Sequence, residues 1–191
     1  MMRKQIGVLA IQGAVSEHVA AIAAVGGQAV LVKHRDDLEA LEGLILPGGE
    51  STTMRRIMQR YHLFDPIKQF AQSGKAIFGT CAGLVLLANS IIGGEEGLGL
   101  LACQVQRNGF GRQKESFEMP LAMEILGEQP FPAIFIRAPF ITACDSNVRV
   151  LAQIDEAIVA VQQQSILATA FHPELSQDLR LMDYFMQHCV A

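Results

Sequence analysis

The sequence predicts an α/β fold, a three-layer sandwich with helices on both faces of a mostly parallel central sheet that carries an antiparallel extension. Up to residue 89, short apolar runs of strand length alternate with segments of helical periodicity, which is typical of βαβ units. Beyond residue 89, short apolar or alternating runs follow one another with only turns between them, which indicates antiparallel strands. No linker rich in proline, serine or charge separates the two regions, so we expect a single domain over residues 1–191.

The first region is expected to hold four strands and the helices between them. Ser16 is positioned to cap the first helix, and Gly26 with Gly27 is positioned to end it. The expected strands cover residues 5–11, 28–32, 44–46 and 76–78, and the later helical segments cover residues 36–41, 54–60, 63–72 and 84–88. Ligands of parallel sheets collect at the carboxyl ends of the strands, so the loops after the first, third and fourth strands are expected to share one edge.

The second region is expected to consist of strands and one closing helix. The strand-like runs cover residues 98–106, 113–120, 122–126, 133–136, 148–154, 158–162 and 166–171. Residues 175–189 place apolar side chains at helical spacing, and we expect them to form a helix whose apolar face packs on the core.

Composition excludes several classes of protein. Half of the 191 residues are hydrophobic and 18% are charged, which is typical of a globular chain with a large core. The net charge of −4 and the lack of a dense Lys/Arg cluster argue against a nucleic-acid partner. No apolar run reaches the length of a membrane span or a signal-peptide core, so we expect a cytoplasmic protein. The four cysteines, at positions 81, 103, 144 and 189, are far apart along the chain and suggest neither a disulfide framework nor a metal site.

The first stretch that carries chemistry is Lys-Ala-Ile-Phe-Gly-Thr-Cys-Ala-Gly, residues 75–83, in which a strand-like run meets a helical run at Cys81. Gly79 and Gly83 flank Cys81 at the spacing of a nucleophile elbow, with Cys in place of Ser. Glycine lets strand and helix approach closely, so that Cys81 projects from a strained backbone, and the N–H groups at the start of the helix favour a thiolate. This stretch alone also fits a buried structural cysteine in a glycine-rich turn.

A histidine and a glutamate two residues apart, His172 and Glu174, follow the last strand-like run. In an extended backbone, residues two apart point to the same side, and the intervening proline stiffens the chain. His172 can take the proton of Cys81 and later deliver one to a leaving group, while Glu174 orients the imidazole. The alternative is an exposed histidine beside a glutamate that caps the last helix. His18, beyond the loop after the first strand, is the second candidate for the base.

Two glycine-rich stretches are candidates for binding. In residues 47–51, Pro-Gly-Gly-Glu-Ser, the backbone N–H of Gly49 can stabilise an oxyanion together with the N–H of Ala82. An ordinary Gly-Gly turn is the alternative. In residues 107–113, Arg107 or Arg112 can hold a carboxylate, although a solvated turn explains the composition equally well.

In combination these stretches resemble the glutaminase subunits of pyridoxal 5′-phosphate synthase, a family within the class I (triad) glutamine amidotransferases. The motifs are spread over nearly the whole chain, and they are Gly-Thr-Cys-Ala-Gly at 79–83, Pro-Gly-Gly-Glu-Ser-Thr-Thr at 47–53, Arg-Asn-Gly-Phe-Gly-Arg-Gln at 107–113, Ile-Arg-Ala-Pro at 136–139 and Phe-His-Pro-Glu-Leu at 171–175. Departures from the family lie only outside these motifs, as at Cys103 and residues 142–147.

The resemblance implies a flavodoxin-like sheet and an enzyme that hydrolyses L-glutamine to L-glutamate and ammonia. It implies that Cys81 attacks the side-chain amide carbon, that Gly49 and Ala82 hold the oxyanion, and that His172, steadied by Glu174, protonates the departing ammonia. The substrate contacts that it implies are Gly48, Gly49, Glu50, Arg107, Ile136 and Arg137. Side-chain chemistry agrees, since Glu50 suits an α-ammonium group and Arg107 an α-carboxylate.

The resemblance also implies a partner. The ammonia is used by a synthase subunit, a TIM barrel that makes pyridoxal 5′-phosphate, in a ring assembly of 12 + 12 subunits, and the ammonia must travel uncharged. The lone glutaminase is expected to be poorly active, with the Gly48–Gly49 peptide as a switch that docking orders. No metal or bound cofactor is expected in this chain.

Two other interpretations of the sequence are possible. A glutaminase of another amidotransferase, or a different cysteine hydrolase, keeps Cys81 and His172 but has no need of Glu50 or Arg107. A non-catalytic, flavodoxin-like binding module needs neither Cys81 nor His172.

Overall fold

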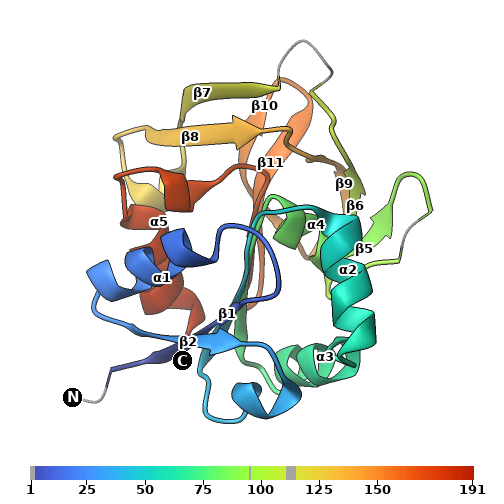
Figure 1. Cartoon of the computed structure of the whole chain (residues 1–191). Coiled ribbons are helices and arrows are strands. Elements are labelled where there is room, and N and C mark those ends of the chain that lie inside the picture. The colour runs from blue at the N-terminus through green and yellow to red at the C-terminus, as the bar shows by residue number, and fades with distance from the viewer. Residues whose placement is uncertain (1–2, 95, 111–114) are drawn as a thin grey trace.

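The computed structural model describes residues 3–94, 96–110 and 115–191, and in these ranges the strands form one ten-stranded sheet and a separate hairpin (Figure 1). The order in the large sheet is β2-β1-β3-β4-β12-β11-β9-β6-β5, with β10 attached to β11. Its strands are β1 (Gln5–Leu9), β2 (Gln28–Val32), β3 (Gly43–Leu46), β4 (Ala76–Thr80), β5 (Ala88–Ile91), β6 (Leu101–Gln106), β9 (Phe140–Cys144), β10 (Arg149–Ile154), β11 (Ala157–Gln163) and β12 (Ile166–Thr169). The hairpin pairs β7 (Ser116–Leu121) with β8 (Phe131–Ile136).

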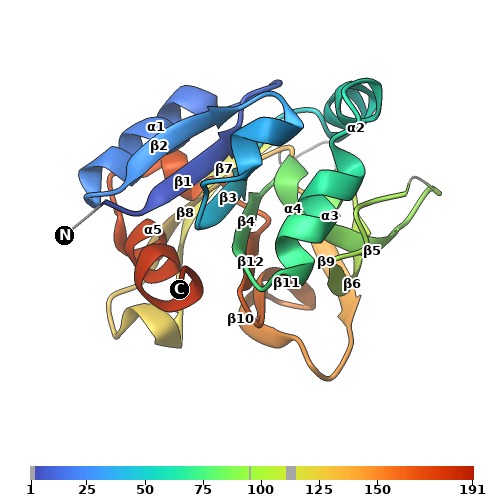
Figure 2. The same ribbon diagram turned by 90° about the horizontal axis from the view of Figure 1, so that it is seen from below.

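Helices cover both faces of the first half of the sheet. They are α1 (Val15–Ala24), α2 (Ser51–Arg60), α3 (Phe64–Gln72), α4 (Ala82–Leu87) and α5 (Arg180–Tyr184), which continues into a π turn, Phe185–Cys189. Figure 2 shows α5 on one side of β3 and β4, and α3 and α4 on the other. Strands covered on both faces need continuous apolar sequence, and β3, β4 and β12 are accordingly buried at every residue.

The parallel part of the sheet confirms the predicted βαβ arrangement. β1 pairs in parallel with β2 on one side and with β3 on the other. The next two strands of the chain therefore lie on opposite sides of β1, and the strand order reverses there. β3, β4 and β12 are also parallel, with Leu46 opposite Gly79 and Thr169 opposite Thr80. The carboxyl ends of these strands therefore lie side by side, at the edge where ligands of such sheets bind.

The antiparallel extension is also confirmed, with corrections in detail. β12, β11, β9 and β6 are antiparallel neighbours, whereas β5 and β6 are parallel. β5 and β9 were not predicted, because each buries few residues and its sequence shows no apolar alternation. Residues 122–126, predicted as a strand, instead contain the 3₁₀ turn Glu124–Leu126, since the chain must reverse there for β7 to pair with β8.

Two helix ends also differ from the prediction. The residue before α1 is Ala14, which makes no side-chain cap, and the Ser16 hydroxyl donates instead to Glu17. The closing helix is shorter than residues 175–189, because the Ser176 and Asp178 side chains accept from the backbone N–H groups of Asp178 and Arg180 and so hold a turn ahead of α5. Among the described residues, no helix has the length and apolar character needed to cross a membrane.

Candidate active site

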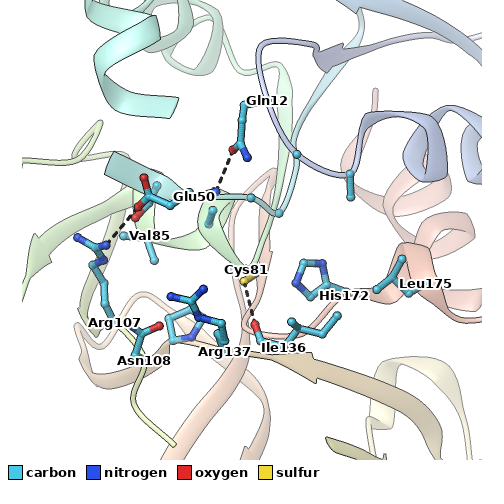
Figure 3. Close-up of a pocket in the computed structure, with 17 residues that line it drawn as sticks. Gln12, Glu50, Cys81, Val85, Arg107, Asn108, Ile136, Arg137, His172 and Leu175 are labelled. Carbon is cyan, nitrogen blue, oxygen red and sulfur yellow. Dashed lines mark hydrogen bonds and ion pairs between the residues drawn. The ribbon is translucent and has the colours of Figure 1, made fainter. Parts of the chain in front are cut away.

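A pocket of about 430 Å³ opens at the carboxyl ends of the parallel strands (Figure 3). It is bounded by the loops after β1, β3, β4, β6, β8 and β12, which brings together residues that lie up to 163 positions apart, from Gln12 to Leu175. Its lining includes every predicted site residue except Glu174, namely Gly48, Gly49, Glu50, Cys81, Ala82, Arg107, Ile136, Arg137 and His172. The spatial convergence that the motifs predict is therefore present.

Cys81 occupies a sharp turn between β4 and α4. Its φ and ψ are 49° and −102°, a region that non-glycine residues rarely adopt, and its backbone N–H donates to the Thr169 carbonyl oxygen at 2.8 Å. A Cβ atom at Gly83 would lie 2.0 Å from the Leu46 carbonyl oxygen, and one at Gly79 would lie 2.7 Å from the Gly83 carbonyl carbon. Both glycines are needed for the approach of helix to strand, as the elbow pattern predicts.

His172 lies between Cys81 and Glu174. Its Nδ1 atom is 2.7 Å from Glu174 Oε1, and all three side chains are buried. Burial lowers the pKa of His172, but hydrogen bonds and charge interactions with Cys81 and Glu174 outweigh burial and raise it to about 10. The arrangement thus stabilises an imidazolium beside the sulfur, which is the protonation state that a proton donor to a leaving group requires.

The local backbone around this pair is not the extended segment that the sequence suggested. Residues 173–175 form a 3₁₀ turn with the proline at its first position, and the His172 N–H donates to the Ile134 carbonyl oxygen at 2.8 Å. Glu174 still reaches His172 because the tight turn folds its side chain back. On its other side the imidazole packs against Gly48, where a Cβ atom would lie 2.2 Å from His172 Cε1.

Glu50 and Arg107 form an ion pair at the rim, with 3.3 Å between Glu50 Oε1 and Arg107 Nη2. Glu50 is the N-cap residue of α2 and accepts from the backbone N–H groups of Thr52 and Thr53 and from the Thr53 hydroxyl. The hydroxyl of Thr53 is the largest cause that lowers the pKa of Glu50, to about 2, and Arg107 adds to it. The rim therefore presents one firmly held negative charge beside one positive charge.

The Gly48–Gly49 peptide is anchored to the loop after β1. The Gly48 carbonyl oxygen accepts from the Ala14 N–H at 2.9 Å, and Gln12 Oε1 accepts from the Glu50 N–H at 2.9 Å. Because a trans peptide points its C=O and N–H in opposite directions, the Gly49 N–H faces away from Ala14. Gly13, with φ of +99°, allows this contact, since a Cβ atom there would lie 1.9 Å from the Gly48 oxygen.

The loop after β8 forms the wall opposite the Gly48–Gly49 peptide. The Ile136 carbonyl oxygen faces Cys81 Sγ at 3.9 Å, and Arg137 has a left-handed φ of 46°. This backbone is held by a hydrogen bond from the Arg137 N–H to the Glu115 carbonyl oxygen at 2.6 Å. Ile136 and Arg137 are thus placed to contact a ligand through their backbones.

Several residues of the site were not predicted. Asn108, Pro139 and Leu175 also line the pocket; they lie inside the motifs that carry the family resemblance, but no role was predicted for them. Arg112, the alternative to Arg107 as a carboxylate ligand, lies outside the described residues. His18, the second candidate for the base, lies behind Glu174 and not beside Cys81, with 3.5 Å between His18 Nε2 and Glu174 Oε2. Within the described ranges, no group of His, Cys, Asp or Glu side chains is arranged to hold a metal ion.

Comparison with known proteins agrees with this geometry. Residues 8–191 match the model of the SNO glutamine amidotransferase family. The chain is 59% identical over 187 residues to a Listeria innocua protein named pyridoxal 5′-phosphate synthase subunit PdxT, covering 98% of this chain and 100% of that one. It is 60% identical over 187 residues to the protein of that name from Listeria monocytogenes, with the same coverage.

A solved structure shares the fold closely. The crystal structure described as that of a glutamine amidotransferase superposes with a TM-score of 0.90 at 43% sequence identity, covering 95% of this chain and 97% of that one. The match of the family model over nearly the whole length, the high identity to the Listeria proteins and this structural likeness agree with one another. The chain belongs to the SNO glutamine amidotransferase family.

Proposed function

We propose that this chain is the glutaminase of a pyridoxal 5′-phosphate synthase, hydrolysing L-glutamine to L-glutamate and ammonia for the synthesis of that vitamin B6 cofactor. The observation that carries the proposal is the buried series of Cys81, His172 and Glu174 at the base of a pocket whose rim bears a carboxylate and a guanidinium. The series offers the three groups that the proposed reaction needs, a nucleophile, a proton carrier and an orienting carboxylate, and the family is one of amidotransferases.

The first half of the reaction uses the sulfur and the imidazolium. The Cys81 thiolate adds to the side-chain amide carbon of glutamine, and the developing oxyanion is held by the backbone N–H groups of Gly49 and Ala82. His172 then gives its proton to the amide nitrogen, so that ammonia leaves and a thioester remains on Cys81. The raised pKa of His172 supplies that proton at neutral pH.

The second half returns the enzyme to its starting state. His172, now neutral, takes a proton from a water molecule that adds to the thioester carbon. Glutamate leaves and Cys81 regains its thiolate beside a reprotonated His172. Glu174 keeps its contact at Nδ1 throughout and so leaves Nε2 as the nitrogen that exchanges protons with sulfur, ammonia and water.

The charged rim sets the choice of substrate. An α-amino acid carries one ammonium and one carboxylate on the same carbon, and Glu50 and Arg107 offer the opposite charges side by side. Glutamine then replaces the internal ion pair with one contact to each group, while the Gly48–Gly49, Ile136 and Arg137 backbones bound its side chain. A substrate that lacks the α-ammonium or the α-carboxylate leaves one of these charges without a partner.

The ammonia is passed to a synthase subunit. The Listeria relatives are named as subunits of a synthase, and this chain covers their full length at about 60% identity. The proposed partner is a TIM-barrel synthase in a 12 + 12 ring within the cytoplasm, and docking of that subunit is proposed to bring the Gly49 N–H into the oxyanion position.

The test is an assay of ammonia and glutamate release from L-glutamine with and without the synthase subunit. Stimulation by the synthase subunit supports both halves of the proposal. If the synthase subunit leaves the glutaminase activity unchanged, the proposed partner is wrong. If the complex releases no ammonia from L-glutamine, the proposed glutaminase activity is wrong. D-Glutamine and glutaramic acid, which lacks the α-ammonium group, should be poor substrates if the rim acts as proposed.

A further inference from the structure

His18 on α1 is a wholly buried titratable side chain that the proposed reaction does not use. Its exposed fraction is 0%, and its Nε2 atom lies 3.1 Å from Thr80 Oγ1 and 3.5 Å from Glu174 Oε2. Thr80 is the last residue of β4, directly before Cys81, and is also fully buried. His18 therefore contacts the catalytic region from behind, through the residue next to the nucleophile and through the orienting carboxylate.

The two oxygens of Glu174 have unequal surroundings. Oε1 is bonded to His172 Nδ1 at 2.7 Å, whereas Oε2 is buried and makes no hydrogen bond within the described part of the chain. His18 Nε2 lies 3.5 Å from Oε2, slightly beyond the length of a good hydrogen bond. A buried carboxylate oxygen without a donor is unfavourable, so a small rotation that shortens this contact is favoured.

The protonation state of His18 decides what it can supply. Burial, acting more strongly than the attraction of Glu174, lowers the pKa of His18, so the ring is neutral and carries one N–H. Its Nδ1 has no partner among the described residues, whereas its Nε2 faces two oxygens. The proton is therefore best placed on Nε2, since a bare ring nitrogen is less costly to bury than an unbonded N–H.

We propose that His18 is a positioning residue of the triad, whose neutral Nε2–H fixes the second oxygen of Glu174 and so keeps the first oxygen on His172. A neutral donor orients the carboxylate without neutralising its charge, which stays available to the imidazolium. The inference rests on the role proposed above for His172 and Glu174.

The consequence for pH dependence follows from the groups around the ring of His172. Those groups are Cys81 after β4, Glu174 in the 3₁₀ turn and, behind it, His18 on α1 with the half-buried Glu17 beside it. Loss of the His18 N–H lets the carboxylate turn away from His172, so the imidazolium loses a partner and deprotonates at lower pH. The alkaline limb of the kcat profile, which reports that deprotonation, then moves to lower pH.

The experiment compares His18→Phe, which substitutes an aromatic ring without an N–H for the imidazole, with His18→Gln, whose amide restores a donor. Both are assayed in the complex with the synthase subunit over a pH series, with folding checked by thermal unfolding. His18→Phe is expected to lower kcat by about tenfold to a hundredfold, with little change in KM, and to shift the alkaline limb down. His18→Gln is expected to recover most of kcat and the wild-type limb.

Ile22→Val, one turn further along α1 and equally buried, is the matched control for a purely structural effect. It should lower the midpoint of thermal unfolding slightly and leave the pH profile unchanged. A His18→Phe complex with the wild-type kcat and alkaline limb overturns the inference, and so does a His18→Gln complex as impaired as His18→Phe. If His18→Phe does not fold, the test is His18→Gln alone, and an alkaline limb of its kcat profile that is shifted from that of the wild type overturns the inference. An inactive wild-type complex would instead contradict the proposed function itself.

A second observation, independent of the first, concerns Cys103 and Cys144. They are directly opposite each other in the antiparallel pair of β6 and β9, and their sulfur atoms are 2.7 Å apart. Opposite positions in such a pair have Cα atoms about 4.5 or 5.5 Å apart, which lies within the range that a disulfide bridges.

The two thiols differ in access and acidity. Cys103 is buried and Cys144 is half-buried, so an oxidant reaches Cys144 first. A hydrogen bond from the Cys103 thiol lowers the pKa of Cys144, while the same bond raises the pKa of Cys103. Cys144 is therefore the thiolate that attacks, and Cys103 the thiol that resolves the product.

We infer that Cys103 and Cys144 are a site of oxidative cross-linking by hydroperoxides. The Cys144 thiolate attacks the peroxide oxygen and becomes a sulfenic acid as water leaves from hydrogen peroxide. The Cys103 sulfur then attacks the Cys144 sulfur, the S–O bond breaks, and a second water leaves with the two protons. One peroxide thus accepts two electrons from the two thiols. The resulting disulfide joins the strand that ends before Arg107 to the strand that begins just after Pro139, two sides of the pocket.

The test uses the Cys81→Ser chain, so that the pocket cysteine cannot react. Treatment with hydrogen peroxide is expected to remove the mass of two hydrogen atoms and to link tryptic peptides 76–107 and 138–149. In the additional Cys103→Ser variant, Cys144 should stop at the sulfenic acid and be trapped by dimedone. Cys103 and Cys144 that both remain fully alkylatable after peroxide treatment, or a disulfide from Cys144 to any other cysteine, would overturn the inference.

Discussion

The two halves of the sheet contribute different parts of the site. The parallel half supplies the buried groups that are proposed to react, because the ends of β4 and β12 hold Cys81, His172 and Glu174 beneath the helices that cover both faces. The antiparallel half and its hairpin supply Arg107, Ile136 and Arg137, which are more exposed and lie at the pocket rim. The parallel half thus fixes the positions of the groups proposed to react. The antiparallel half presents surface residues whose substitution can alter substrate binding with little effect on the stability of the core.

This difference has a physical origin. Strands covered on both faces are held by packing on every side. A residue with a strained backbone, such as Cys81, persists only where many surrounding contacts hold it in place. Residues at the rim are held by a few hydrogen bonds and ion pairs that water also reaches, as for Glu50 and Arg107. Substitutions in the two halves should therefore have effects of different kind as well as of different size.

The largest effect is expected from Cys81→Ala, which removes the proposed nucleophile. Ammonia release from glutamine by the complex should fall by roughly a thousandfold or more, since no other group in the pocket can form the thioester. Thermal unfolding should stay close to wild type, because the side chain removed is small. Cys189→Ala removes a buried thiol from the π turn, away from the pocket, and should leave activity unchanged. Wild-type ammonia release by Cys81→Ala would refute the proposed mechanism.

Gly83→Ala should be next, because the elbow has no room for one methyl group. The new Cβ atom would lie 2.0 Å from the Leu46 carbonyl oxygen, so β3 and α4 must separate and Cys81 must move. We expect a loss of roughly 1–3 kcal/mol in the free energy of unfolding and a large loss of kcat.

Gly74→Ala provides the control for Gly83→Ala. Gly74 also has no side chain, but its φ of +85° strains an alanine without any clash, and it lies far from the pocket. It should cost about 1 kcal/mol in urea unfolding and leave kcat unchanged. Equal kinetics for the two alanine variants would show that the packing of the elbow does not set the position of the sulfur.

What could be predicted from the sequence depends on whether the signal is local. The elbow and the His172–Glu174 pair could be predicted because their signals are local: glycines at fixed offsets and a carboxylate two residues from a histidine. β5 and β9 could not, since their sequences bury too little to show a period. The positions of His18 behind Glu174 and of Cys103 beside Cys144 also escaped prediction, because they depend on how α1 packs and on the register of β6 with β9.

A change at the rim should alter binding more than chemistry. Arg107→Gln removes the cation proposed to hold the α-carboxylate, and KM for glutamine should rise by roughly tenfold to a hundredfold with a smaller change in kcat. Arg149→Gln, which breaks an exposed ion pair with Glu124 elsewhere in the antiparallel half, should leave KM unchanged. Steady-state kinetics of the complex distinguish the two. A fall in kcat without a rise in KM would place Arg107 in the chemistry and not in binding.

The smallest effect is expected in the acid stability of Glu50, the carboxylate at the rim. Its folded pKa of about 2 is below the ordinary value of 4.5, so its ionised form stabilises the fold at pH values above 4.5, and this contribution is lost as pH falls from 4.5 towards 2. Glu50→Gln should therefore lower the free energy of unfolding near pH 7, by no more than about 1 kcal/mol because the side chain is half exposed.

The measurement is urea unfolding of wild type and Glu50→Gln at several pH values between 7 and 3. The gap between the two should be constant down to about pH 5 and then narrow, as the wild-type carboxylate takes up its proton. Glu156→Gln, in the exposed turn between β10 and β11, controls for the loss of one negative charge and should leave the free energy of unfolding unchanged at pH 7. A gap that stays constant to pH 3 would mean that the hydrogen bonds of Thr52, Thr53 and Arg107 do not favour the ionised form of Glu50.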